Sequence, residues 1–153
     1  MIEKAKISDA KQIQSVINIH AREGKMLERS VMEIYESIRD FFVYRKKDKI
    51  VGVTALRIYW DDLAEIRSVA VLKSESGKGV GDKLLKACFK DAKEIGIKKV
   101  FVLTYIPEYF KKYGFKVVDK STLPHKIWKD CVKCPKFPDC GEVPMVKQIT
   151  KDK

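Results

Sequence analysis

A glycine-rich turn in the middle of the chain has the spacing of an anion-binding loop. The apolar stretch Ile66–Val71 leads to Ser76-Gly77-Lys78-Gly79-Val80-Gly81, and the amphipathic stretch Asp82–Lys93 follows directly. Glycines leave backbone N–H groups unobstructed, and the N-terminus of a helix carries partial positive charge. The turn can therefore hold a phosphate, although an ordinary tight strand–helix connection is an alternative interpretation.

Two common nucleotide-binding motifs fit this turn poorly. A Walker loop would end in Gly-Lys-Ser or Gly-Lys-Thr, and neither is present. A dinucleotide-binding fold would place the glycines after the first strand, whereas here they follow the fourth expected strand. The turn therefore favours a phosphate-bearing ligand of another class.

A second group of candidate ligands lies near the C-terminus. His125, Cys131, Cys134 and Cys140 could form a zinc site with three thiolates and one imidazole. Three cysteines in a short loop are not the paired Cys-x-x-Cys units of a strong zinc signature. Reduced cysteines that pack the loop are therefore the favoured interpretation, and zinc is the alternative.

Composition and charge limit the class of protein. The chain has 153 residues, of which 45% are hydrophobic and 35% charged, as expected for one globular domain. The net charge of +11 fits an anionic small molecule, and the scattered lysines argue against nucleic acid. No apolar run approaches the ~20 residues of a membrane span, and the first residues do not resemble a signal peptide. We expect a cytoplasmic protein with no membrane partner, in which disulfides are disfavoured.

Hydrophobic periodicity predicts a mixed α/β domain. Strands are expected at Ile2–Ile7, Phe41–Arg45, Ile50–Tyr59, Leu63–Leu72, Val100–Leu103, Phe115–Val118 and Val143–Ile149. Helices are expected from Ser8-Asp9 to Gly24, from Ser30 to about Arg39, and at Asp82–Lys93, Pro107–Tyr113 and Leu123–Trp128. A helix crossover makes Val100–Leu103 parallel to Leu63–Leu72. On the second helix, Val31, Ile34, Tyr35 and Ile38 are expected to face the core.

With these elements in place, residues 2 to about 119 resemble the GCN5-related N-acetyltransferase (GNAT) family. The match rests on Ile66–Val71, the glycine turn, its helix, and Tyr109-Phe110-Lys111-Lys112-Tyr113-Gly114-Phe115. The resemblance implies one acetyltransferase domain over residues 1–153, with a core at 1–119 and a cysteine-containing extension at 120–153. It also implies acetyl-CoA as acetyl donor, with its pyrophosphate on the turn and its pantetheine arm paired to the strand. The implied cofactor-binding residues are Val69, Ala70, Val71, Ser76, Gly77, Lys78, Gly79, Val80 and Gly81.

Within the family, the closer similarity is to the acetyltransferase domain of N-acetylglutamate synthases of the short single-domain type. It is carried by Met26-Leu27-Glu28-Arg29-Ser30, by the strand Ala64–Val71, and by Leu103-Thr104 with the later Tyr109-Phe110. The resemblance implies that Arg29 binds a substrate carboxylate and that Glu65 is the general base. It implies direct acetyl transfer, in a ternary complex, to the α-amine of L-glutamate, the first step of arginine synthesis.

Two further site residues and several alternatives complete the expectation. Many family members protonate the leaving thiolate with a tyrosine where this chain has Phe110, so Tyr105 is the substitute candidate. Glutamate brings two carboxylates and Arg29 can pair with one, so Lys126 is the candidate for the second. The alternatives are acetylation of another amino acid, a polyamine or a protein lysine, or a non-catalytic acyl-CoA-binding regulatory module. A homodimer is expected only from the resemblance.

Overall fold

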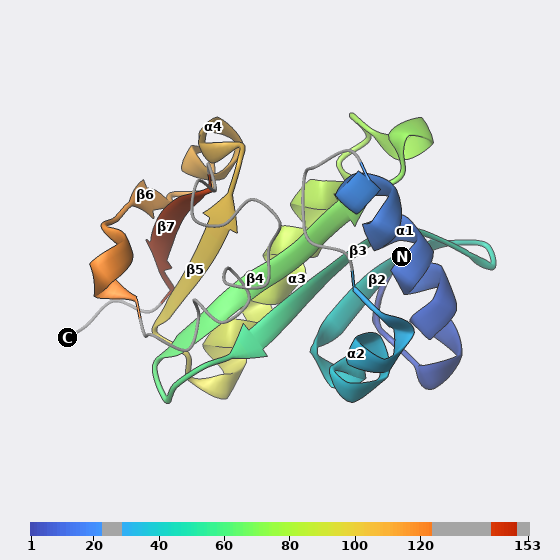
Figure 1. The fold of residues 1–153 in the computed structure, drawn as a ribbon, viewed down its shortest axis with the longest axis horizontal. Helices are drawn as coiled ribbons and strands as arrows, with labels where there is room; N and C mark the ends of the chain where they lie inside the picture. The colour runs from blue at the N-terminus through green and yellow to red at the C-terminus, as the bar shows by residue number, and fades with distance from the viewer. Residues whose placement is uncertain (23–28, 124–141, 150–153) are drawn as a thin grey trace.

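A seven-stranded sheet forms the centre of the molecule (Figure 1). The computed structural model describes residues 1–22, 29–123 and 142–149. In chain order the elements are β1 Ile2–Lys4, α1 Ala10–Arg22, α2 Val31–Glu36, β2 Phe41–Lys46, β3 Lys49–Ile58, β4 Leu63–Val71, α3 Val80–Ile95, β5 Lys99–Thr104, α4 Pro107–Lys111, β6 Lys116–Val117 and β7 Val143–Gln148. Short 3-10 helices lie at Ile7–Asp9, Ile38–Asp40, Lys73–Glu75 and Lys120–Thr122.

The strand order is β1-β2-β3-β4-β5-β7-β6. The pair β4–β5 is parallel and the other neighbours are antiparallel. The helix α3 connects β4 to β5, which is the crossover that the sequence predicts. The last strand, β7, lies between β5 and β6, so the C-terminal part of the chain contributes a strand to the sheet.

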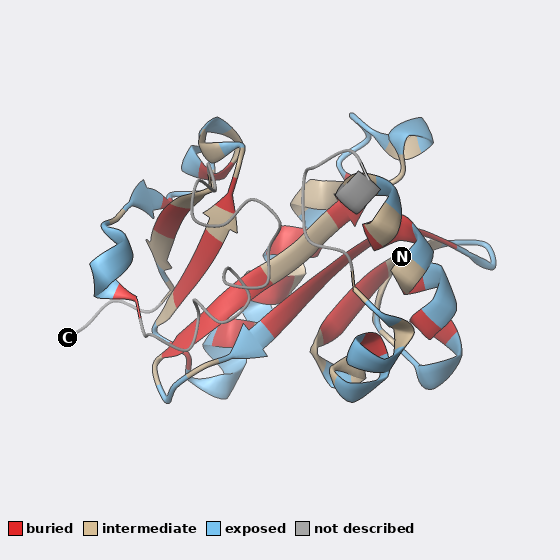
Figure 2. Ribbon diagram, viewed as in Figure 1, coloured by how far each residue is buried: buried red, intermediate tan, exposed pale blue. Residues whose placement is uncertain are grey.

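Helices cover both faces of the sheet. The face toward α3 buries an apolar cluster that includes Ala64, Ile66, Leu84, Leu85 and Met145. The other face packs against α1 and α2 through a cluster that includes Ile13, Ile17, Ile34, Val43 and Val53. Figure 2 shows this arrangement as buried central strands between helices whose outer surfaces are exposed. Among the described residues, no helix has the length and apolar composition needed to cross a membrane.

Several predicted boundaries differ from the structure. The helix α3 begins at Val80 rather than Asp82, because Gly79 takes a left-handed conformation and acts as its N-cap. The helix α2 ends at Glu36 and is followed by the 3-10 helix Ile38–Asp40. The prediction that Tyr35 faces the core is wrong, since this residue is 39% exposed. The helix expected at Leu123–Trp128 falls almost entirely on residues 124–128, outside the described ranges.

An ion pair ties the start of α1 to the sheet. The buried Asp9 carboxylate accepts hydrogen bonds from Arg45 Nη2 on β2 and from the backbone N–H of Lys6, both at 2.9 Å. Arg45 also contacts Glu3 on β1 at 3.1 Å. Burial raises the pKa of Asp9, but the hydrogen bonds from Arg45 and Lys6 outweigh burial, so the pKa is lowered. The charged form of Asp9 therefore stabilises the fold.

We predict that Asp9→Asn lowers the free energy of unfolding by about 1–3 kcal/mol at pH 7, since it removes the charged partner of Arg45. The folded pKa lies below the unfolded value of about 3.9, so the contribution is present above that pH and is lost as the pH falls through the folded pKa. Urea denaturation of both proteins between pH 7 and pH 2 measures the difference. The control Glu108→Gln breaks only an exposed contact with Lys111 and should leave stability nearly unchanged. A loss for Asp9→Asn that is equal at all pH values would contradict the assignment.

Candidate active site

The parallel strands β4 and β5 separate partway along their length (Figure 1). They pair at Leu63–Lys99, Ala64–Val100 and Glu65–Phe101, and within the described residues β4 has no strand on this side beyond Glu65. A bulge follows at once, because Ser68 has φ +56° and lies with Val69 opposite a single residue of β3. Bulges bend the strand that carries them. The result is an opening in the sheet, with the edge of β4 at Val69–Val71 on one side.

His20 contacts this open edge from α1. Its Nε2 lies 2.9 Å from the backbone carbonyl oxygen of Val71. A carbonyl oxygen only accepts, so Nε2 carries the proton in this contact. The contact joins segments 51 residues apart, so sequence spacing does not predict it.

The glycine turn lies at the end of the same edge. Gly77 and Gly79 have φ +78° and +80°, a conformation that favours glycine. Gly79 provides no side-chain cap for α3, so the N–H groups of the first turn have no bond from an N-cap side chain. Ser76 and Lys78 are exposed beside the turn. The turn therefore has the geometry that the sequence suggested for an anion.

Aromatic residues of α4 and its end pack against the start of α3. A Cβ atom on Gly81 would lie 2.7 Å from the Tyr109 hydroxyl oxygen, so glycine leaves room for this phenol. The Tyr113 hydroxyl donates to Asp82 Oδ1 at 3.0 Å. Burial, together with the hydroxyl of Tyr109 and the carboxylate of Asp82, raises the pKa of Tyr113. These contacts fix the first turn of α3 relative to the opening.

The carboxylate of Glu65 lies where the two strands separate. Glu65 is only 8% exposed, and its Oε1 accepts a hydrogen bond from the Tyr59 hydroxyl at 3.0 Å. The Nε of Arg67 is 3.4 Å from the same oxygen. Burial and the nearby charge of Glu65 raise the pKa of Tyr59, so this phenol stays protonated and able to donate. Both contacts favour a charged Glu65.

A cavity of about 410 Å³ adjoins the bulge. Three arginines line it: Arg29 before α2, Arg57 on β3 and Arg67 on β4. Ser68 at the bulge is also a lining residue, so the cavity reaches the opening in the sheet. The remaining lining residues are Glu33, Ile34, Glu36, Ser37, Asp40, Phe41, Ala55 and Ile58. Arginine side chains match carboxylates in geometry as well as charge. The cavity is therefore suited to a small molecule that carries carboxylates.

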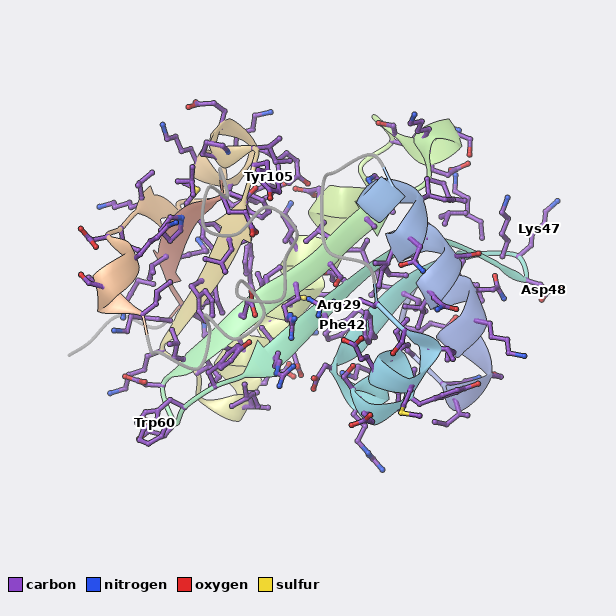
Figure 3. The ribbon with its side chains drawn as sticks, in the orientation of Figure 1. Arg29, Phe42, Lys47, Asp48, Trp60 and Tyr105 are labelled. Atoms are coloured by element: carbon purple, nitrogen blue, oxygen red, sulfur yellow. The ribbon has the colours of Figure 1, made fainter. Side chains whose placement is uncertain are left out.

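Arg29 is held in place from α1. Its backbone N–H donates to Asn18 Oδ1 and its carbonyl accepts from Gln14 Nε2, both at 3.2 Å. The guanidinium lies 3.5 Å from the exposed carboxylate of Glu33. Figure 3 shows Arg29 over the central strands, in agreement with its place in the cavity wall. Arg67 connects the two predicted residues, since it lines the cavity with Arg29 and contacts Glu65.

The other predicted residues are placed as follows. Tyr105 directly follows β5 and lies at the end of that strand, before α4 (Figure 3). Lys126 and the possible zinc ligands His125, Cys131, Cys134 and Cys140 lie outside the described residues. In the part of the chain that is described, no three His, Cys, Asp or Glu side chains are grouped to hold a metal ion.

Sequence reasoning missed four residues of this region: Arg57, Tyr59, Arg67 and Asp40. The arginines interrupt strands that are otherwise mostly apolar, which is the signal that could have identified them. Asp40 lines the cavity, and burial raises its pKa although Lys4, Arg57 and Arg67 act in the opposite direction. Perturbed carboxyl groups in a cavity are typical of functional sites.

Comparisons with known proteins identify the family of this chain. Residues 12–115 match the model of the acetyltransferase (GNAT) family. An N-acetyltransferase of Chlorobaculum tepidum, described as uncharacterized, is 43% identical over 97% of this chain and 96% of its own length. An amino-acid acetyltransferase of Mycobacterium tuberculosis is 31% identical over 85% of this chain and 76% of its own.

Among solved structures, the N-acetylglutamate synthase of Neisseria gonorrhoeae, in complex with coenzyme A and N-acetyl-glutamate, matches with a TM-score of 0.90 and 25% identity. The match covers 99% of this chain and 35% of that chain. The family model and the two relatives span most of the sequence, including β4, the glycine turn and α3. The chain belongs to the GNAT family of acetyltransferases.

Proposed function

We propose that this acetyltransferase moves the acetyl group of acetyl-CoA to the α-amine of an amino acid, with L-glutamate as preferred acceptor. One observation carries the proposal: the arginine-lined cavity meets the opening in the sheet beside Glu65. The names of the Mycobacterium and Neisseria relatives support the same acceptor class. In this proposal the reaction would be the first step of arginine synthesis.

The cofactor side of the proposal uses the open edge and the turn. The pantetheine arm carries amide groups, which can pair with the edge of β4 at Val69–Val71, where no strand of the described residues lies, as an added strand would. This pairing would replace the contact of His20 with the Val71 carbonyl oxygen. The pyrophosphate then reaches the N–H groups of Gly77–Gly81 at the start of α3. This path leads the thioester toward the bulge at Ser68, where the cavity begins.

The acceptor side uses Arg29 and Glu65. Arg29 binds the α-carboxylate, and Glu65 takes a proton from the substrate ammonium, directly or through water. The neutral nitrogen attacks the thioester carbonyl carbon, the C–S bond breaks, and the nitrogen releases its second proton to water. Glu65 also returns its proton to water, and water reprotonates the group that donates to the thiolate. Tyr105 is the proposed donor of a proton to the departing thiolate. The products are an N-acetylamino acid and coenzyme A.

Transfer is direct in this proposal because no suitable nucleophile lies on β4. The strand carries Ser68 at its bulge and no cysteine. Among the described residues, the one cysteine is Cys88 on α3, which is fully buried. Burial raises the pKa of its thiol to about 12, so it is not a thiolate near neutral pH. A covalent acetyl-cysteine intermediate is therefore disfavoured.

Release of free thiol from acetyl-CoA tests the proposal against its alternatives. The purified chain is assayed with glutamate, glutamine, aspartate, spermidine and a lysine peptide. We predict the highest kcat/KM with glutamate, because each of its two carboxylates can pair with an arginine of the cavity wall. Turnover only with spermidine or the peptide would replace the acceptor class, and binding of acetyl-CoA with no turnover would favour a regulatory module.

Replacing the proposed base tests the chemistry. We predict that Glu65→Gln lowers kcat/KM for glutamate by about 10²- to 10⁴-fold, since the amide cannot accept the ammonium proton. The KM for acetyl-CoA should stay near that of the unmodified chain. Steady-state kinetics across pH measures both, with Glu94→Gln on the exposed side of α3 as matched control. Unchanged kcat/KM and pH profile in Glu65→Gln would show that Glu65 is not the base.

The turn yields a matched pair of variants. Gly79→Ala puts a side chain on a residue with φ +80° at the N-terminus of α3, and Gly96→Ala does so at φ +90° at its C-terminus. Each costs roughly 1–2 kcal/mol of backbone strain, but only the first displaces N–H groups of the turn. We predict that Gly79→Ala raises the Kd for coenzyme A by about tenfold and that Gly96→Ala lowers stability alone. Calorimetric titration measures the two Kd values, and equal values would contradict a role for the turn in binding.

A further inference from the structure

We infer that Arg57 binds the side-chain carboxylate of a dicarboxylic acceptor and thereby sets a preference for glutamate over glutamine. The inference rests on the proposed function, in which Arg29 binds the α-carboxylate. A second carboxylate then needs a second cation. The sequence suggested Lys126, which lies outside the described residues, whereas Arg57 lies in the wall of the cavity.

Arg57 is placed next to the proposed base. Its Cα is the register partner of Glu65 across the β3–β4 pair. Directly paired residues have Cβ atoms roughly 5 Å apart, so Arg57 and Glu65 begin at neighbouring points of the sheet. The Arg57 guanidinium lies over Tyr59, with Cζ 5.5 Å from the ring centroid. One dicarboxylic acceptor can therefore present its ammonium group to Glu65 and a carboxylate to Arg57.

The three cavity arginines differ in their partners. Arg29 has Glu33 at 3.5 Å, and Arg67 has Glu65 at 3.4 Å. Within the described ranges, no carboxylate oxygen comes within 4.0 Å of an Arg57 nitrogen. The Tyr59 ring occupies a face of the guanidinium, and the N–H donors point outward in its plane. Arg57 can thus present a bidentate pair of donors to a ligand.

Charge is distributed unevenly around the cavity. The acidic residues Glu33, Glu36 and Asp40 lie on α2 and directly before β2, whereas Arg57 and Arg67 lie on β3 and β4. Burial raises the pKa of Asp40, whereas the charges of Lys4, Arg57 and Arg67 act in the opposite direction. An anionic group is therefore drawn to the strand side. A neutral amide of the same shape would keep hydrogen bonds there but lose the charge.

The test compares glutamate with glutamine, which differ by this one group. Initial rates are measured for the unmodified chain, Arg57→Gln, Arg57→Lys and Arg29→Ala. Arg57→Gln should lower kcat/KM for glutamate by about ten- to a hundredfold and leave that for glutamine within about threefold, because only glutamate loses a charged partner. Arg57→Lys should restore part of the glutamate rate. Arg29→Ala should lower both substrates alike, since both carry the α-carboxylate.

The outcomes separate this inference from the proposed function. Arg57 is exposed on the strand, so Arg57→Gln should keep the melting temperature of the unmodified chain, which a thermal scan checks. A similar loss for both substrates in Arg57→Gln, or no loss for glutamate, would overturn the role of Arg57 while leaving amino-acid acetylation intact. An unmodified chain that acetylates neither amino acid would overturn the proposed function and this inference with it.

Discussion

The bulge at Ser68 is the constraint on which the rest of the site depends. Before it, Ala64 and Ile66 face the α3 cluster, and after it Val69 and Val71 do so, because the extra residue shifts the alternation by one. The bulge thus bends β4 and also changes which side chains each face presents. Glu65 and Arg67 lie on the cavity face just before this shift. An uninterrupted strand would have continued its pairing with β5 and left no opening.

The electrostatics of the site follow from this geometry. A buried carboxylate is costly unless it is paired, and Glu65 receives a phenol and a guanidinium. Arg67 contacts Glu65 and also lines the cavity. The ion pair of Glu65 and Arg67 therefore connects the proposed proton acceptor to the cavity proposed for the substrate carboxylates. The opposite end of the opening depends on backbone groups at the glycine turn. An acyl donor and an anionic acceptor can therefore approach the bulge from different sides.

Much of the fold could be predicted from the sequence, because it depends on local patterns. Apolar periodicity identified the order of elements, and the helix crossover implied that β4 and β5 are parallel. Tyr35 was misplaced because helical spacing alone cannot tell the edge of an apolar face from its centre. The predicted start of α3 is two residues late because the apolar pattern does not indicate the left-handed conformation of Gly79.

The site could be predicted only where a motif carried it. The glycine turn, Glu65 and Arg29 belong to recognisable segments, and the structure places the two side chains around Arg67. Arg57 and Tyr59 lie near Glu65 because of the register between β3 and β4, which one sequence does not reveal. His20 meets Val71 only once α1 has packed on the sheet. Long-range register and bulges, rather than composition, therefore decide the details of the site.

A crystal structure of the chain with coenzyme A and N-acetylglutamate would test the central claim most directly. We predict the pantetheine arm along Val69–Val71, the pyrophosphate at Gly77–Gly81, and the acetylated nitrogen near Glu65. We also predict the two product carboxylates at Arg29 and Arg57. Coenzyme A bound away from the opening between β4 and β5, or a product whose carboxylates avoid the cavity arginines, would contradict the account.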